Sequence, residues 1–282
     1  MRTQSPDTSP QAERVQIELF RQASISKRFA IMGAWSQLLI EANKESIHRQ
    51  YPNADEKEIG LIFVARHYGQ DVADKLQTIP IREKAAKSSD NSLLSGAIMP
   101  VIEALERLDM SYYIGGSVAS SIYGIARADF NIDIVADLKL EHVQPLVRSL
   151  EADYYIDADT VKDAIRRKSS FSAIHLETML KVDVFILKSR PFDQEAFRRM
   201  RQEKLTEDSS PVSIVSAEDI ILNKLEWYRM GGEVSDRQWG DVLGVLKVQG
   251  TNLDLAYLRR WAAALNVTDL LERALDDAGL AG

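Results

Sequence analysis

The stretch from Tyr112 to Leu138 combines residue types that can bind phosphate and cations. A short strand-like run enters the turn formed by Gly115, Gly116 and Ser117, and the chain then continues as a helix. Such a turn presents free backbone amides and the positive end of the helix dipole, and glycine lets a phosphate approach the chain closely. The same residues also suit a plain strand-to-helix turn, so both interpretations stand at this point.

Two aspartates lie inside aliphatic strand-like runs, Asp133 in "NIDIV" and Asp183 in "KVDVFIL". A carboxylate among buried aliphatic side chains is usually ion-paired, hydrogen-bonded or bound to a cation, because its desolvation is unfavourable. If the two strands are neighbours, both aspartates converge on one site, and oxygen ligands beside substrate phosphates favour Mg²⁺. The alternative is a pair of structurally hydrogen-bonded acids.

The order of these features resembles the DNA polymerase β-like nucleotidyltransferase superfamily, and within it bacterial proteins of the AbiEii toxin and minimal-nucleotidyltransferase type. The resemblance extends over roughly residues 93–276 and includes "EDIILNKLEWYRMGGEVSDRQWGDVLGVLKVQG". It implies an α+β fold with a mixed sheet flanked by helices. It also implies two Mg²⁺ ions held by three carboxylates, and transfer of a nucleoside monophosphate from a nucleoside triphosphate to a hydroxyl of RNA, protein or a small molecule.

The resemblance also assigns the phosphate contacts. Gly115, Gly116 and Ser117 would hold the β- and γ-phosphates, and Arg127 would steady the triphosphate. Lys224 matches a lysine of AbiEii-like proteins that could neutralise charge on the transferred phosphoryl group. A surface lysine on an amphipathic helix is the alternative for Lys224.

In the metal site, the resemblance makes Asp133 a ligand, and Asp183 a ligand that also helps to deprotonate the acceptor. Asn131 stands where the family has a bridging aspartate; it keeps an oxygen but loses the charge, which weakens metal binding. Asp129 would lie about 13 Å from Asp133 in a regular strand, whereas paired metals lie about 4 Å apart. It can therefore contribute only if the chain curls back before Asn131. Asp241 matches an acid of the family's C-terminal motif, or is a solvent-facing or hydrogen-bonded acid.

Helices are expected throughout residues 1–88. In "FAIMGAWSQLLIEANKE" one apolar stripe recurs at helical spacing, formed by Ile31, Trp35, Leu38 and Ala42. Asn53, with Glu56 three residues later, predicts the cap of a second helix. The polar, serine-rich residues 81–92 predict a linker.

After this linker, residues 92–215 alternate between strand-like and helical runs and are expected to form the nucleotidyltransferase-like domain. Residues 216–282 predict a C-terminal helical bundle. Its first helix is expected to begin at a Ser216 cap and to stop at Gly231 and Gly232.

The composition sets limits on the class of protein. The chain has 282 residues, 45% hydrophobic and 27% charged, with a net charge of −7 and no cysteine. The charge argues against a broadly basic nucleic-acid binder, and the missing cysteines exclude disulfides and thiolate chemistry. "IRRK" at residues 165–168 could contact a phosphate backbone or form a solvated helix end. We find no membrane span or leader and expect a cytoplasmic protein.

Three functions remain open from the sequence. The first is Mg²⁺-dependent nucleotidyl transfer, for example by a toxin acting on tRNA or by a nucleotide-modifying antitoxin, with the N-terminal helices recognising an acceptor, a partner or a second copy of the chain. The second is a catalytically degenerate nucleotide-binding or partner-binding protein, which Asn131 favours. The third is an unrelated α/β structural domain.

Overall fold

Alternating residues build the two central strands of the sheet. The computed structural model describes residues 3, 7–77 and 93–280. In β2 (Asn131–Ala136) and β5 (Lys181–Ile186), every second side chain is buried and the intervening ones are partly exposed. This period of two is that of a strand with two unlike faces. One face is aliphatic, and the other carries Asp133 and Asp183.

Seven described strands pair in the order β3-β4-β5-β2-β1-β7-β6. The pairs β2–β5 and β1–β7 are parallel and the other four are antiparallel, so the sheet is mixed. The expected α+β fold, with a mixed sheet flanked by helices, is confirmed. The remaining strands are β1 (Tyr112–Ile114), β3 (Tyr154–Tyr155), β4 (Ser170–His175), β6 (Arg201–Glu203) and β7 (Val212–Ile214). The sequence patterns did not predict β6 and β7.

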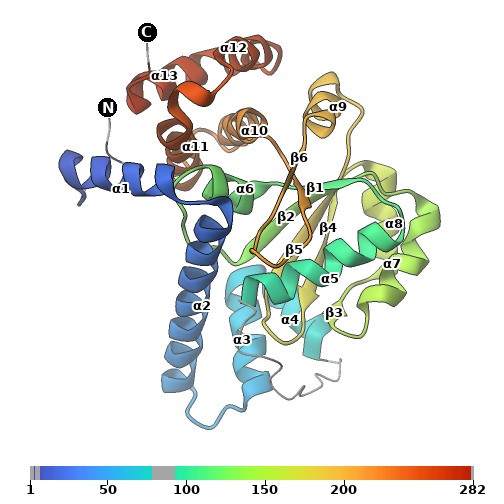
Figure 1. Cartoon of the computed structure of the whole chain (residues 1–282). Coiled ribbons are helices and arrows are strands. Elements are labelled where there is room, and N and C mark those ends of the chain that lie inside the picture. Colours follow the sequence, from blue (N-terminus) through green and yellow to red (C-terminus); the bar gives the residue numbers. More distant parts are fainter. Residues whose placement is uncertain (1–2, 4–6, 78–92, 281–282) are drawn as a thin grey trace.

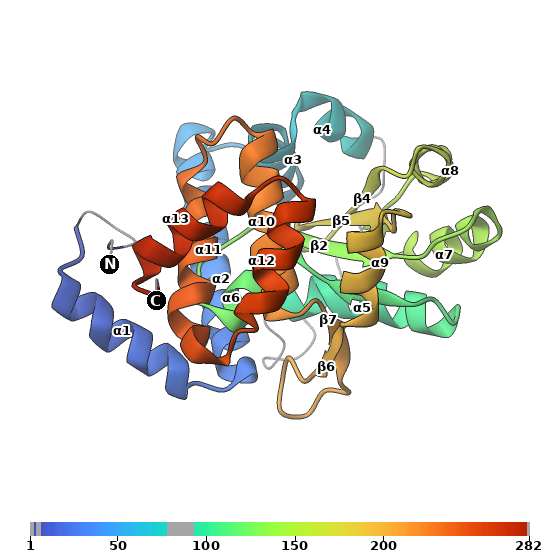
Figure 2. The same ribbon diagram turned by 90° about the horizontal axis from the view of Figure 1, so that it is seen from above.

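Helices surround the sheet on several sides (Figures 1 and 2). Those of the first half are α1 (Pro10–Gln22), α2 (Ile25–Gln50), α3 (Glu56–Tyr68), α4 (Gln70–Gln77), α5 (Leu93–Arg107) and α6 (Gly116–Tyr123). Within and after the sheet follow α7 (Val143–Leu150), α8 (Ala158–Arg167) and α9 (Pro191–Arg198). The C-terminal helices are α10 (Ala217–Met230), α11 (Asp236–Gln249), α12 (Leu255–Ala264) and α13 (Thr268–Ala278). In Figure 2 the C-terminal helices lie on the side of the molecule opposite α7 and α8.

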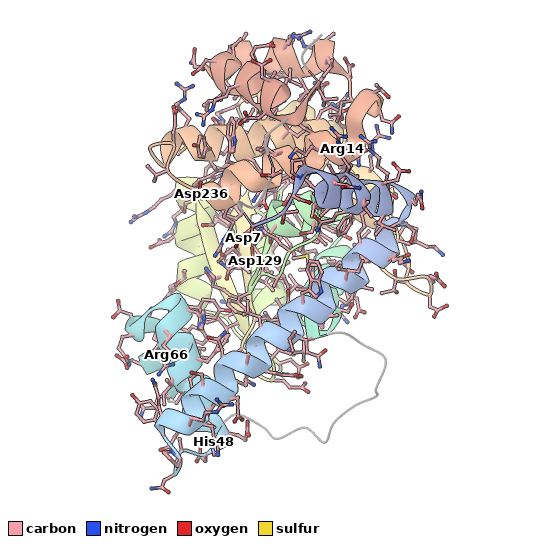
Figure 3. All side chains as sticks on the ribbon, turned by 90° about the vertical axis from the view of Figure 1, so that its left-hand side faces the viewer. Asp7, Arg14, His48, Arg66, Asp129 and Asp236 are labelled. Carbon is pink, nitrogen blue, oxygen red and sulfur yellow. The ribbon has the colours of Figure 1, made fainter. Side chains whose placement is uncertain are left out.

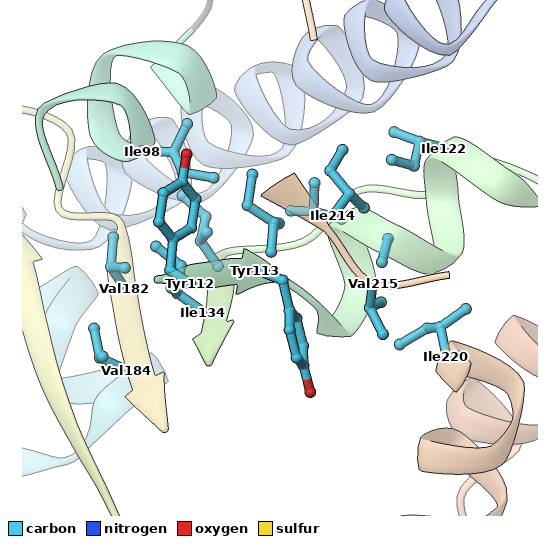
Figure 4. Packing of buried hydrophobic residues seen from close by; sticks show 14 of the residues in the cluster. Ile98, Tyr112, Tyr113, Ile122, Ile134, Val182, Val184, Ile214, Val215 and Ile220 are labelled. Atoms are coloured by element: carbon cyan, nitrogen blue, oxygen red, sulfur yellow. The ribbon is translucent and has the colours of Figure 1, made fainter. Parts of the chain in front are cut away.

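The side chains of β1 alternate between the two faces of the sheet. Tyr112 and Tyr113 extend to opposite sides of the strand, as Figure 4 shows. On the side of Tyr112, Ile98 of α5 packs near Val182 and Val184. Tyr113 faces the other side, where it lines a pocket together with Asp133. The aliphatic face is therefore the core, and the acidic face is left for a pocket.

Helix α2 confirms the predicted helix but not its buried face. Trp35 is 43% exposed and Leu38 is 65% exposed, whereas Met32 and Ile40 are fully buried. Both sets recur at helical spacing, and periodicity alone does not say which of two apolar stripes packs inward. Association of copies through these helices stays a prediction.

Helix caps agree with the sequence at one position and differ at another. The Ser216 hydroxyl accepts a hydrogen bond from the Asp219 N–H, and α10 ends directly before the two predicted glycines. The cap expected at Asn53 is wrong, because Asp55 and Glu58 form the reciprocal capping box of α3. Both pairs have the required spacing, and the chain uses the second.

The hydrophobic core is continuous between the N-terminal helices and the sheet. Phe29 and Phe63 belong to the same buried cluster as Ile134 and Leu246. The division at residues 88, 92 and 216 stays a prediction, and the expected linker, residues 81–92, lies outside the described residues. Residues 165–168 form the end of α8, with Arg166 and Arg167 exposed. Within the described ranges, no helix combines the length and apolar character of a membrane span.

Candidate active site

The parallel register of β2 and β5 places the two predicted aspartates side by side. Asp133 pairs with Asp183, and Asn131 pairs with Lys181. Paired residues on adjacent strands have backbones about 4.8 Å apart and side chains on the same face. The four side chains therefore form one polar group on the sheet.

The glycine turn lies directly against Asp133. Gly116 has φ of 52°, and a Cβ atom at this position would overlap Asp133 Cγ and Oδ2. The Gly115 N–H donates a hydrogen bond to the Asp133 carbonyl oxygen at 2.8 Å. Only glycine satisfies both the backbone conformation and the space, so the start of α6 and the carboxylate are placed together.

Ser117 is less accessible than the sequence assignment requires. Its side chain is 3% exposed, and its hydroxyl donates to the Asn131 carbonyl oxygen at 3.3 Å. The Gly115 N–H and the Ser117 hydroxyl therefore both have partners, so the amides from Gly116 onward are the ones that a phosphate could approach. The hydroxyl instead ties α6 to the start of β2.

A pocket of about 350 Å³ opens between this turn, the acidic face of the sheet and α10. Gly115, Gly116, Asp133 and Lys224 line it. Asn131, Asp183, Ser117 and Arg127 lie outside its lining. Its other walls are mainly apolar and aromatic, with charged residues at the rim: Tyr113, Val135, Phe185, Ile186, Leu187, Lys188, Arg190, Asp193, Ile220, Asn223, Glu226, Trp227, Met230 and Gln238.

Lys224 belongs to a buried charge network behind the pocket. Its Nζ lies 2.7 Å from Asp241 Oδ2, and its side chain is 10% exposed. Arg127 contacts both oxygens of Asp241, through Nε at 2.6 Å and Nη2 at 3.0 Å. Burial alone would raise the pKa of Asp241, but the hydrogen bonds and charges of Arg127 and Lys224 hold it below its usual value. Both sequence candidates, Lys224 and Asp241, are therefore buried rather than solvated.

Asp129 does not continue β2 as a regular strand. Its Oδ1 accepts hydrogen bonds from the N–H groups of Phe130 and Asn131, which is a local turn, and its Oδ2 lies 2.6 Å from Arg127 Nη1. Its own N–H donates to Ser36 Oγ of α2. In Figure 3 Asp129 lies in the middle of the view, near α2, the helix that carries Ser36. Asp129 and Asp241 thus engage Arg127, which the sequence assigned to the triphosphate.

Asp133 has an unusual environment for a carboxylate. Its pKa is raised to about 6, first by burial and then by the charge of Asp183, while Lys224 opposes both effects. Ionisation of a buried carboxylate is unfavourable unless a cation or a hydrogen-bond donor lies beside it. Among the predicted site residues, it is the carboxylate that faces the pocket.

Asp183 already has two partners. Lys181 Nζ lies 2.8 Å from its Oδ2, and Ser172 Oγ donates to its Oδ1 at 2.5 Å. Above Lys181 lies the ring of Tyr68 from α3, 5.5 Å from Nζ to the ring centre. Lys181 is a site residue that the sequence patterns did not indicate, although its spacing of two residues from Asp183 places both side chains on one strand face.

The donor atoms fit one Mg²⁺ better than two. Asn131 Oδ1 is buried and has no hydrogen-bond partner among the described residues. Asn131 lies two residues from Asp133 on the same strand face, so this oxygen is a candidate ligand. Because both Asp183 oxygens already have partners, the Asp133 carboxylate and this amide oxygen suit a single hard cation beside phosphate oxygens. Within residues 7–77 and 93–280, no three His, Cys, Asp or Glu side chains form a group that could hold a metal. The three-carboxylate set that the resemblance implies is therefore incomplete.

Comparison with known proteins adds two remote structural neighbours. No protein-family model and no curated protein matches the chain. An antigenic nucleotidyltransferase-like protein from Paracoccidioides brasiliensis is 16% identical, with a TM-score of 0.43, covering 67% of this chain and 94% of that one. The antibiotic-resistance factor ANT(2'')-Ia is 14% identical, with a TM-score of 0.39, covering 61% and 94%. These TM-scores are too low to bear on the activity of this chain.

Proposed function

We propose that the chain is a nucleotidyltransferase that binds a nucleoside triphosphate in the pocket between α6, the sheet and α10. The observation that carries the proposal is the contact between Gly116 and Asp133 at the start of α6. This contact places the backbone amides at the start of α6 beside a carboxylate, and the Lys224 side chain lines the same pocket. Phosphate and a cation are the ligands that such a combination binds.

Each part of the pocket has a role in this proposal. The amides at Gly116 hold the outer phosphates, and Lys224 stabilises negative charge on the transferred group. The aromatic walls, with the Phe185 and Trp227 rings 6.3 Å apart, provide an apolar surface for the nucleobase. Asp133 and the Asn131 amide oxygen would hold Mg²⁺, which would neutralise phosphate charge. Asp183, paired with Lys181 and Ser172, would lie beside the ion.

Group transfer would follow the usual balance for a nucleotidyl donor. An acceptor hydroxyl oxygen forms a bond to the α-phosphorus, the bond to the pyrophosphate oxygen breaks, and pyrophosphate leaves. The hydroxyl proton passes to a carboxylate. Asp133 is better placed for this step than Asp183, because Asp133 lines the pocket while both oxygens of Asp183 are already occupied.

The acceptor that we propose is a hydroxyl of RNA, such as tRNA, or of a protein, in an AbiEii-like, toxin-antitoxin setting in the cytoplasm. The sequence resemblance supports this part. Exposed apolar side chains beside the pocket, at Trp227 and Met230, also leave a surface on which a second substrate could dock.

A second function is favoured by one observation. Asn131 replaces a carboxylate, and Lys181 occupies an oxygen of Asp183, so the site has fewer free negative charges than paired metals need. This combination supports nucleotide binding without turnover.

The experiment that tests binding is calorimetric titration with each of the four nucleoside triphosphates and Mg²⁺. The parent should bind at least one of them, and Asp133→Asn should lose Mg²⁺-dependent binding while it unfolds at the same or a higher temperature. Asp269→Asn, a change in an exposed acid of α13, is the matched control and should bind as the parent does. Unaltered binding in Asp133→Asn would refute the proposed site.

Transfer is tested separately, with labelled triphosphates and a mixed RNA pool or the protein itself as acceptor. Label that becomes covalently attached in the parent, but not in Asp133→Asn, supports the enzyme. Triphosphate binding without any transfer supports the second function.

A further inference from the structure

The four polar side chains on the sheet face have a mixed charge. Asp133 and Asp183 are acidic, Asn131 is neutral and Lys181 is basic, and the register places Lys181 next to Asn131. With both acids ionised, the net charge of the group is −2 + 1 = −1. Three carboxylates without the lysine would give −3.

Lys181 is held in this group by direct contacts with Asp183 and Tyr68. Its Nζ lies 2.8 Å from Asp183 Oδ2, and Ser172 of β4 fixes the other carboxylate oxygen. Tyr68 of α3 covers the ammonium with its ring and donates its hydroxyl hydrogen to the Phe130 carbonyl oxygen at 3.2 Å. A cation over an aromatic face is attracted by the ring quadrupole. The ammonium is therefore fixed in place rather than extended into solvent.

Because Lys181 and Asp183 are only partly exposed, solvent screens the charge of the ammonium weakly. The side chain of Lys181 is 21% exposed and that of Asp183 is 15% exposed. Ion pairs are screened less at such positions than at the surface, so a divalent cation beside the ammonium would meet appreciable repulsion.

Resting on the proposed function, we propose that the Lys181 ammonium is a built-in counter-ion that takes the place of one of two divalent cations. The pocket then binds a nucleoside triphosphate with a single Mg²⁺ on Asp133 and the free Asn131 oxygen. Lys181 acts through Asp183 and through the charge of the group, and is a positioning residue. Asn131 and Lys181 act in the same direction. The missing carboxylate and the additional ammonium each make the site less negative, so a second cation is bound less favourably.

The test counts bound Mn²⁺ by electron paramagnetic resonance, with a non-hydrolysable triphosphate at saturation. The parent should hold one ion per chain in the complex, and Asn131→Asp should still hold one, because the new carboxylate meets Lys181. The double variant Asn131→Asp with Lys181→Met should hold two. Two ions in the parent, or one in the double variant, would overturn the inference.

A second arm uses Mn²⁺ alone, so that it does not depend on nucleotide binding. Lys181→Met frees an oxygen of Asp183 and removes a positive charge, so Mn²⁺ should bind on the order of tenfold more tightly, equivalent to about 1.4 kcal/mol. Lys181→Gln serves if the methionine variant does not fold. Affinity equal to or below that of the parent in a folded variant would contradict the inference.

Lys162→Met is the matched control, because Lys162 also lies 2.8 Å from an aspartate, Asp159, but on the surface of α8. It should leave the Mn²⁺ affinity unaltered. If no variant binds a triphosphate while Lys181→Met tightens Mn²⁺ binding, the proposed function fails and the role of Lys181 stands.

Discussion

At the scale of single residues, Gly116 and Asp133 determine the shape of the pocket floor. The φ of 52° at Gly116 and its close approach to the carboxylate are both incompatible with a side chain. The carboxylate in turn is partly buried beside a second acid, which raises its pKa to about 6, mainly through burial. Each residue therefore has a property that a single substitution can test.

Gly116→Ala should destabilise the protein and abolish triphosphate binding. The backbone conformation alone costs about 1 to 3 kcal/mol for alanine, and the new methyl group displaces Asp133. Urea unfolding and calorimetry measure the two effects. Gly96→Ala in α5 is the control, because nothing lies within 4 Å of the place that its methyl group would take; it should be neutral or stabilising by about 0.5 to 1 kcal/mol. Intact binding in Gly116→Ala would show that the turn is not part of the site.

The raised pKa of Asp133 predicts a pH dependence of stability. The folded chain holds this proton more tightly than the unfolded chain between about pH 4 and pH 6, so ionisation lowers stability as the pH rises through that range. Asp133→Asn removes this titration. Relative to the parent, the variant should gain up to about 3 kcal/mol between pH 4 and pH 7. Urea unfolding of both proteins at several pH values checks this, and a constant difference would show that the pKa is not raised.

At the scale of elements, Asp241 joins three segments that lie far apart in the sequence. It pairs Lys224 of α10 with Arg127 of the connection before β2, from its own position in α11. The same connection carries Asp129, which Arg127 also contacts. These ion pairs set the position of α10 relative to the sheet, and thereby the width of the pocket.

Asp241→Ala should lower the free energy of unfolding by about 3 to 5 kcal/mol, because two buried cations lose a partner. Triphosphate affinity should fall as well, since Lys224 loses the contact that orients it. Asp269→Ala removes the exposed partner of Arg229 and should leave stability and affinity unaltered. Equal effects of the two substitutions would argue that the network around Asp241 is not important for the site.

At the scale of the whole molecule, the N-terminal helices form part of the frame of the site. Phe63 of α3 is fully buried and its ring packs 5.5 Å from that of Phe130, the residue that precedes β2. Tyr68 of the same helix covers Lys181. Helix α2 contributes Ser36, which bonds the N–H of Asp129. These contacts reach the start of the strand that carries the candidate ligands.

Phe63→Ala should therefore affect both stability and binding. A large-to-small change at this buried position costs about 3 to 5 kcal/mol, and it loosens the chain just before Asn131. Trp35→Ala, on the exposed face of α2, is the control and should alter neither quantity. Thermal unfolding and triphosphate titration are the measurements. Full triphosphate affinity in folded Phe63→Ala would mean that the N-terminal helices act independently of the site.

Local patterns were sufficient to predict the strands and the turn of the candidate site. Alternation of aliphatic residues with Asp133 and with Asp183 predicts strands with one polar face, because side chains alternate along a strand. The glycine pair predicts the turn, because a positive φ and a close approach require glycine. Strand alternation and the positive φ depend on neighbours in the sequence, whereas the carboxylate that Gly116 approaches, Asp133, is supplied by the fold.

Only the tertiary structure decided which of these residues line the pocket and which form ion pairs elsewhere. Arg127 and Asp241 are 114 residues apart, and no periodicity indicates that they pair. Likewise, two apolar stripes of α2 are equivalent in the sequence, and packing selects the one that contains Met32. Partner choice among charges and faces depends on the packing of distant elements, because an ion pair or a buried face forms only where the fold excludes water.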